Sequence, residues 1–76
     1  MVLDCVKRIL SEQLGIDESS ITEDTRLVED LNLDSIDKAE LVTTLEDEYD
    51  KTVDYEQAMK VKTVGDIVKE IEKVLG

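Results

Sequence analysis

Apolar side chains recur every three or four residues along three long stretches of the chain, which is the spacing of an amphipathic α-helix. The first stretch covers residues 2–14 and is followed by Gly15, a residue that readily takes the left-handed conformation at a helix end. The second begins at Asp34 and fades at Asp50, and the third begins after Thr63. The apolar positions are Val2, Val6, Ile9, Leu10 and Leu14 in the first stretch, Ile36, Ala39, Leu41, Val42, Leu45 and Tyr49 in the second, and Val64, Ile67, Val68, Ile71, Val74 and Leu75 in the third.

The stretches between these helices have a different pattern. Residues 17–33 lack a sustained period but carry scattered apolar positions, which indicates a long ordered loop anchored to the core. These positions are Ile21, Leu27, Val28 and Leu31. Residues 53–61 are long enough only for a helix of one or two turns. No stretch alternates with a period of two. The pattern therefore predicts an all-α fold in a single domain over residues 1–76: a small antiparallel four-helix bundle with three long helices and one short helix, and a long loop between helices one and two.

Acidic residues dominate the charge of the chain. Its 76 residues include 20 Asp and Glu, 9 Lys and Arg and no His, so the formal net charge is −11 at pH 7. Nucleic acids and anionic membranes repel such a polyanion, and we expect a basic protein surface as its partner. The charge is unevenly distributed, because residues 34–56 carry nine acids and two bases, a net −7, whereas residues 57–76 carry three acids and four bases, a net +1.

Length and cysteine content exclude further classes of protein. A chain of 76 residues buries too little surface to support a large catalytic cleft. Its single cysteine, Cys5, cannot form an internal disulfide, and no apolar run is long enough for a signal peptide or a membrane span. These features predict a cytoplasmic monomer with no membrane or nucleic acid partner.

Asp34, Ser35 and Asp37 stand where the second long helix begins. Asp34 suits the N-cap position and Asp37 falls three residues later, so Ser35 becomes the first helical residue, with an exposed hydroxyl. The free N–H groups of a helix start favour a phosphate group at this point. The chain has no His to activate the hydroxyl, so an external enzyme would have to modify Ser35. Taken alone, an Asp-Ser pair at a helix start more often serves only as a cap.

The far end of the same helix carries acids in an unfavourable position. Glu46, Asp47, Glu48 and Asp50 lie near its C-terminus. There the helix dipole disfavours each negative charge by a few tenths to about 1 kcal/mol. We therefore expect these acids to serve a purpose other than helix stability.

The wider sequence around Ser35 resembles the acyl carrier protein family. The segment VEDLNLDSIDKAELVTTLEDEY, residues 28–49, is similar to the family signature, in which an Asp-Ser-Leu site opens an acidic helix. The resemblance extends to Leu14-Gly15 at the end of the first helix and to KTVGDI, residues 62–67, at the start of the last. It spans nearly the whole chain, and motif, charge distribution, length and helix order agree.

The resemblance implies a carrier that is not itself an enzyme. Ser35, preceded by Asp34, would receive 4′-phosphopantetheine from coenzyme A through a Mg²⁺-dependent phosphopantetheinyl transferase. The thiol of this arm would hold acyl chains as thioesters and deliver them to the enzymes of fatty acid biosynthesis. Basic patches of these enzymes would dock on Asp34, Ile36, Asp37, Glu40, Glu46 and Asp47. The acyl chain would lie between the second helix and its neighbours, at Leu27, Leu45, Val53, Ala58, Val61 and Ile67. These last six residues also suit an ordinary aliphatic core.

Several positions depart from the common family pattern. Ile36 replaces the usual Leu after the serine, and Lys38 adds a positive charge to the expected docking face. Ala39 and Thr43 are smaller or more polar than the usual residues. Further departures around the short helix are Asp54, Tyr55 and Met59. These departures leave two roles open. The chain serves ordinary fatty acid synthesis, or it is a dedicated carrier for another acyl or aminoacyl group, of polyketide or peptidyl type.

A calcium-binding loop is a further hypothesis, because Asp30-x-Asn32-x-Asp34 begins like an EF-hand. The pattern then fails: Ser35 stands where glycine is required for the turn, and Leu41 stands where a bidentate glutamate is required. We therefore expect no metal site.

Two further hypotheses do not require modification of Ser35. The chain could be an unmodified acidic helical module that binds a basic partner. Alternatively, Cys5 could be the acyl-bearing thiol, although only Lys7 and Arg8 stand near it in the helix to activate it, and a packing role suits it better.

Overall fold

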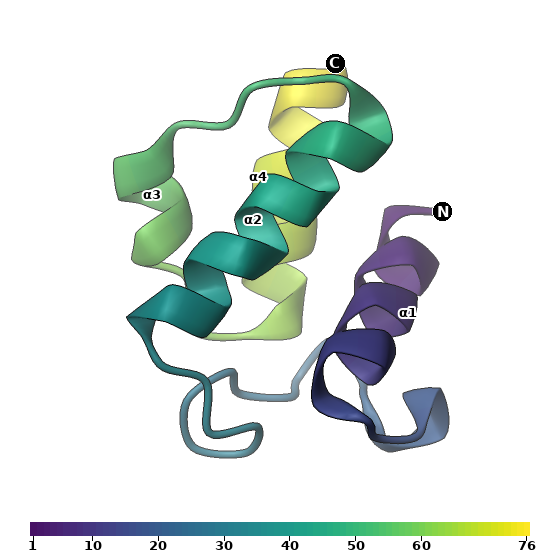
Figure 1. The fold of residues 1–76 in the computed structure, drawn as a ribbon. Helices are drawn as coiled ribbons and strands as arrows, with labels where there is room; N and C mark the ends of the chain where they lie inside the picture. Colours follow the sequence, from purple (N-terminus) through teal and green to yellow (C-terminus); the bar gives the residue numbers. More distant parts are fainter.

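In the computed structural model, which describes residues 1–76, four α-helices surround one apolar core (Figure 1). The helices are α1 (Val2–Leu14), α2 (Ser35–Tyr49), α3 (Tyr55–Met59) and α4 (Val64–Leu75). Consecutive helices run in opposite directions. The chain forms no β-strand, and Arg26 and Thr63 make only an isolated bridge. The predicted all-α bundle of three long helices and one short helix is therefore confirmed.

Residues at the helix ends determine where α1 stops and where α4 begins. Gly15 takes the left-handed conformation, with φ of 68°, and its N–H donates to the carbonyl of Ser11 at 2.8 Å, which ends α1. α4 begins with a capping box: Thr63 Oγ1 accepts from the N–H of Asp66 at 3.2 Å, and Asp66 Oδ2 accepts from the N–H of Thr63 at 3.2 Å. Both predicted helix ends are confirmed.

The apolar positions of the three long helices meet in a core of 16 buried residues. Core side chains come from every helix, and others come from the segments between helices. The core has no aromatic residue; Tyr49 packs against its edge, half-buried. Burial of this aliphatic surface is the main force that holds such short helices together, because an isolated helix shorter than about 12–15 residues is marginal in water.

The long loop between α1 and α2 is ordered, and hydrogen bonds join it to the connection between α3 and α4. The N–H of Leu27 donates to the carbonyl of Lys62 at 2.8 Å, and the N–H of Val64 donates to the carbonyl of Thr25 at 2.9 Å. The loop also contains a short 3₁₀ helix, η1 (Glu18–Ser20), which the apolar pattern did not predict because none of its residues is buried.

Two of the four apolar anchors predicted for this loop lie in the core. Ile21 and Leu27 are buried, whereas Leu31 is half-buried and Val28 is 47% exposed. The prediction was wrong for Val28 because residues 26–31 form a tight turn, in which Leu27 takes the core position and its neighbour faces outward. Leu33, which we did not predict as an anchor, is buried just before α2 begins.

Candidate functional site

Ser35 is the first residue of α2, and its side chain is exposed. Asp34 is the N-cap: its Oδ1 accepts from the N–H of Asp37 at 2.8 Å, and Asp37 Oδ2 accepts from the N–H of Asp34 at 3.2 Å. This reciprocal capping box fixes the backbone on both sides of the serine. The predicted positions of Asp34, Ser35 and Asp37 at the helix start are confirmed.

Two further contacts position the start of α2 against the rest of the molecule. Asn32 takes the left-handed conformation, with φ of 59°, which asparagine tolerates better than most residues and which brings Leu33 into the core. Gln13 of α1 donates from Nε2 to the carbonyl of Asp37 at 3.1 Å. The serine therefore stands on a helix start that is tied to α1 and to the core.

The backbone N–H groups of Ser35 and Ile36 make no hydrogen bond within the protein. The capping carboxylate of Asp34 satisfies the N–H of Asp37 instead. Two donors at the positive end of the helix dipole are thus free beside the serine hydroxyl, an arrangement that suits a phosphate group.

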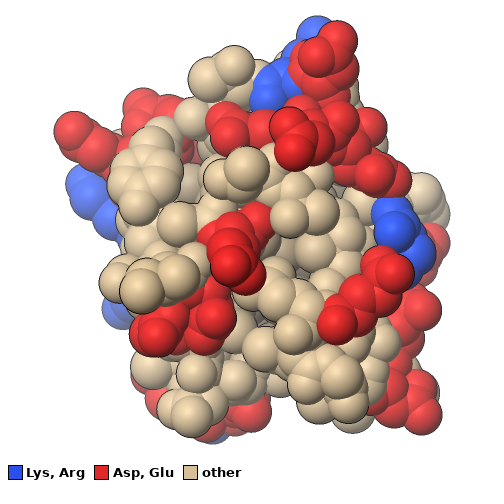
Figure 2. Space-filling view, in the orientation of Figure 1, with Lys and Arg blue, Asp and Glu red and all other residues tan.

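Acidic residues occupy much of the surface around α2. On the face shown in Figure 2, acidic side chains surround an uncharged central area and basic side chains lie at the edges. Of the six residues predicted to dock partner enzymes, Asp34, Ile36, Glu40 and Asp47 are exposed, and Asp37 and Glu46 are half-buried. Ile36 is 70% exposed, an unusual position for a large apolar side chain.

Two of the acids near the end of α2 have partners within the protein, which the sequence did not predict. Glu46 Oε2 accepts from the N–H of Val53 at 2.8 Å. Glu48 Oε1 lies 2.7 Å from Nη2 of Arg8, so it pairs α2 with α1. These two contacts account for the positions of Glu46 and Glu48 without a partner protein.

Lys38 extends from α2 toward the end of α3. Its side chain is half-buried, and Nζ donates to the carbonyls of Met59 at 3.5 Å and Val61 at 3.3 Å. The ammonium therefore turns toward the end of α3. Sequence spacing could not reveal this, because both acceptors are backbone carbonyls more than twenty residues away.

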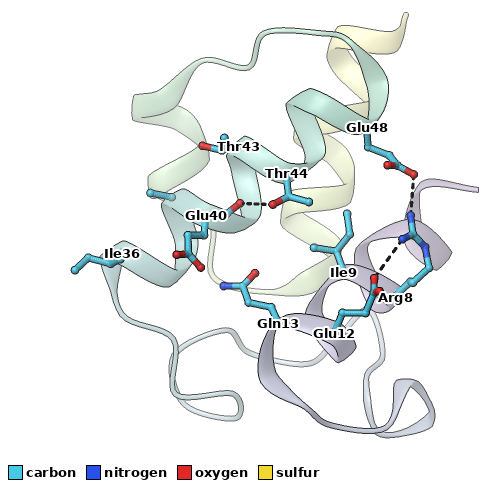
Figure 3. Close-up of a pocket in the computed structure, with 10 residues that line it drawn as sticks. Arg8, Ile9, Glu12, Gln13, Ile36, Glu40, Thr43, Thr44 and Glu48 are labelled. Atoms are coloured by element: carbon cyan, nitrogen blue, oxygen red, sulfur yellow. Dashed lines mark hydrogen bonds and ion pairs between the residues drawn. The ribbon is translucent and has the colours of Figure 1, made fainter.

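A shallow groove of about 610 Å³ lies between α1 and α2, as Figure 3 shows. It is lined by Arg8, Ile9, Glu12, Gln13, Ile36, Ala39, Glu40, Thr43, Thr44 and Glu48. Arg8 crosses its rim: Nη1 lies 3.3 Å from Glu12 Oε1, and Nη2 lies 2.7 Å from Glu48 Oε1. The negative charge of Glu48, and to a smaller extent that of Glu12, raises the pKa of the Arg8 guanidinium. The groove places Ile36, Ala39 and Thr43 on one open surface, so three of the positions that depart from the family pattern lie together.

The six residues predicted to shelter an acyl chain lie in the core. Leu27, Leu45 and Ala58 are fully buried, and Val53, Val61 and Ile67 are at most 7% exposed. They belong to the same apolar cluster, so the structure brings them together. Their packing serves the fold in the absence of any chain.

The structure gives Asp30 and Cys5 contacts within the protein. Asp30 pairs with Arg26 at 3.0 Å, and hydrogen bonds from Arg26 lower the pKa of the Asp30 carboxyl. Cys5 is half-buried, with Sγ 3.6 Å from Nη2 of Arg8. Burial raises the pKa of Tyr49 to about 12, and a hydrogen bond with Cys5 contributes to this rise.

The structure contains no cluster of three or more potential metal ligands. No helix has the length and apolarity that a membrane crossing requires.

Comparison with known proteins places this chain in a family. The family described as "Phosphopantetheine attachment site" matches residues 4–71. The acyl carrier protein of Thermotoga maritima is 51% identical over 71 residues, which cover 93% of this chain and 88% of that protein. The acyl carrier protein of Chlamydia felis is 44% identical over 69 residues, which cover 91% of this chain and 88% of that protein.

Solved structures agree with these relatives. A Mycobacterium tuberculosis protein described as an acyl carrier protein superposes with a TM-score of 0.88 at 32% identity, covering 96% of this chain and 97% of that one. The acyl carrier protein of Enterococcus faecalis superposes with a TM-score of 0.79 at 37% identity, covering 96% of this chain and 92% of that one.

The fold is thus that of a phosphopantetheine attachment domain. More specifically, the chain belongs to the acyl carrier protein family. It acts as a carrier and not as an enzyme, and its cofactor is covalent 4′-phosphopantetheine.

Proposed function

We propose that Ser35 is the residue that receives 4′-phosphopantetheine, and that Asp34 positions it. The observation that carries this proposal is the capping box, which presents the Ser35 hydroxyl to solvent at the first position of α2. In the transfer, Ser35 Oγ loses its proton and bonds to the phosphorus of the pantetheine phosphate, while the pyrophosphate link of coenzyme A breaks and adenosine 3′,5′-bisphosphate leaves. Because the chain has no His to take this proton, the phosphopantetheinyl transferase supplies the base.

The free N–H groups of Ser35 and Ile36 support the same residue as the attachment point. The phosphodiester keeps a negative charge, and these donors and the helix dipole stabilise it. The carboxylate of Asp34 is engaged in the cap, so its charge is partly offset beside the phosphate.

The test is intact mass after incubation with coenzyme A, Mg²⁺ and a broad-specificity phosphopantetheinyl transferase. The unmodified protein should gain the mass of one phosphopantetheine, and Ser35→Ala should gain nothing. Ser19→Ala is the matched control, because Ser19 is also an exposed serine that follows an acidic residue. A mass gain in Ser35→Ala, or none in the unmodified protein when a known carrier is modified, would contradict the proposal.

We propose further that the arm carries acyl thioesters to the enzymes of fatty acid biosynthesis, which dock on α2. Asp34, Ile36, Asp37, Glu40, Glu46 and Asp47 are the proposed docking residues. The exposed acids among them suit basic patches, and the exposed Ile36 suits an apolar contact. Exposed ion pairs contribute about 0.2–1 kcal/mol each, so these complexes should be short-lived and weakened by salt.

The bundle core is the proposed shelter for the acyl chain. Its proposed lining is Leu27, Leu45, Val53, Ala58, Val61 and Ile67, which supply only aliphatic surface. Because these side chains pack against one another, a chain has to displace part of this packing to enter. In this proposal residues 1–76 act as one carrier domain, and the cytoplasmic location remains a prediction.

A dedicated carrier for another acyl or aminoacyl group is the second candidate. The observation that favours it is the groove surface around Ala39 and Thr43, which is less apolar than the family pattern would make it. Loading assays with synthases of the two pathways distinguish the candidates, because only the true partner should use this carrier efficiently.

A further inference from the structure

The segment that contains α3 is held to α2 by one side chain at each end. At its start, Glu46 Oε2 accepts from the N–H of Val53 at 2.8 Å. At its end, Lys38 Nζ donates to the carbonyls of Met59 and Val61 at 3.5 and 3.3 Å. We refer to these contacts as the Glu46 clasp and the Lys38 clasp. Both come from α2, so α3 is tied to that helix at both ends.

α3 itself buries little surface. It is five residues long, and Ala58 is its only buried side chain, while Tyr55 is 58% exposed. A helix of this length is unstable by itself. No backbone N–H donates to the carbonyls of Met59 or Val61, so the Lys38 clasp satisfies both. A positive charge at this helix end also complements the helix dipole.

The Lys38 clasp lies beside the proposed attachment point. Lys38 follows Ser35 by three residues, and residues three apart are neighbours on a helix surface. Three of the residues proposed to shelter the acyl chain, Val53, Ala58 and Val61, belong to the clasped segment or its edges. An arm on Ser35 therefore starts next to Lys38, and its cargo has to pass between α2 and this segment to reach them.

We propose that Lys38 is a positioning residue that controls entry of the acyl chain into the core. The Lys38 clasp is closed in the unloaded carrier and opens when a long chain enters, while the Glu46 clasp remains as the hinge. The end at Lys38 is the one that opens, because its hydrogen bonds, at 3.5 and 3.3 Å, are longer and weaker than the 2.8 Å bond at Val53. This inference rests on the proposed function of Ser35.

The test measures amide hydrogen exchange of residues 55–61 in the unmodified protein, in the carrier loaded with acetyl-phosphopantetheine and in the carrier loaded with octanoyl-phosphopantetheine. Lys38→Met keeps the apolar stem and removes the ammonium. In the unmodified and acetyl forms, exchange in Lys38→Met should be about fivefold faster than in the parent protein. In the octanoyl form the two proteins should exchange at the same rate, because the clasp is already open.

Two further variants isolate the role of the clasp. Lys38→Arg retains a cationic donor and should behave as the parent protein in all three forms. Lys51→Met makes the same chemical change at an exposed lysine just before the segment, and it should change none of the rates. If Lys38 only stabilised the fold, Lys38→Met would accelerate amide exchange equally in the acetyl and octanoyl forms.

Each contrary result has a separate meaning. No acceleration in unmodified Lys38→Met would overturn the clasp itself. Equal acceleration in the acetyl and octanoyl forms would overturn the control of entry and leave attachment at Ser35 intact. If no arm attaches to Ser35, the proposed function fails and this inference fails with it.

Discussion

At the scale of single residues, Asp34 and Asp37 explain why Ser35 is presented as it is. Each carboxylate accepts a backbone N–H of the other residue, so the chain leaves the loop and enters α2 between them. The serine needs no contact of its own to be exposed at the first helical position. The sequence was sufficient to predict this arrangement, because a capping box depends only on residues three apart.

Substitutions of Asp34 should distinguish the contribution of its capping hydrogen bond to stability from that of its negative charge. Asp34→Ala should lower the free energy of unfolding by about 1 kcal/mol, because the N–H of Asp37 loses its acceptor. Asp34→Ser should cost much less, because a serine oxygen caps almost as well. Urea unfolding measures both values. Equal losses in the two variants would show that the charge of Asp34, and not its cap, stabilises the start of α2.

Asp66 should make the stability of the fold depend on pH. Hydrogen bonds from the N–H groups of Lys62 and Thr63 lower the pKa of this carboxyl in the folded protein. Its stabilising contribution is therefore present above the usual carboxyl pKa and is lost as the pH falls through the lowered pKa.

Comparing the parent protein with Asp66→Asn isolates this effect, because the asparagine oxygen still accepts a hydrogen bond but does not titrate. Asp17 and Asp30, whose pKa values are also lowered, are present in both proteins. Urea unfolding between about pH 7 and pH 2 should show the stability difference between the two proteins shrinking as the pH falls. A difference that is constant with pH would contradict the assignment.

At the scale of helices, local patterns predicted the elements but not the contacts between them. Apolar spacing and caps placed the three long helices correctly, since both signals lie within the helix itself. The roles of Lys38 and Glu46 were not predictable, because their partners are backbone groups of the α3 segment. The exposure of Val28 was missed for a similar reason: a turn, and not a period, determines which side chain faces the core.

These contacts change which acids of α2 best test docking. Glu46 bonds to Val53, so reversing its charge would disturb the fold as well as the surface. The Glu40 side chain is exposed and makes no hydrogen bond or ion pair, so its reversal acts on the surface alone. Glu72 on α4 is an equally exposed acid and serves as the matched control.

Glu40→Lys should weaken binding to a phosphopantetheinyl transferase about two- to fivefold and should reduce the salt dependence of binding, because one exposed ion pair is lost. Glu72→Lys should change neither quantity appreciably. Titration calorimetry at low and at moderate salt measures both. Equal effects of the two reversals would show that only the total charge of the carrier matters.

At the scale of the whole molecule, the net charge of −11 is concentrated in one region of the chain. Residues 34–56 hold −7 of it, and five of their nine acids lie on α2, the helix that also carries the exposed Ile36 and, at its start, Ser35. The proposed attachment point, docking face and entrance to the core are thus combined at one helix.

The central claim is that this helix carries its cofactor on Ser35. Trypsin cleaves after Arg26 and Lys38 and releases a peptide of residues 27–38, in which Ser35 is the only hydroxyl residue. The direct measurement is the mass of this peptide in protein isolated from its own host. We predict that it carries the mass of one phosphopantetheine, with or without an acyl group. The same peptide without added mass, together with a modified peptide elsewhere in the chain, would contradict the account.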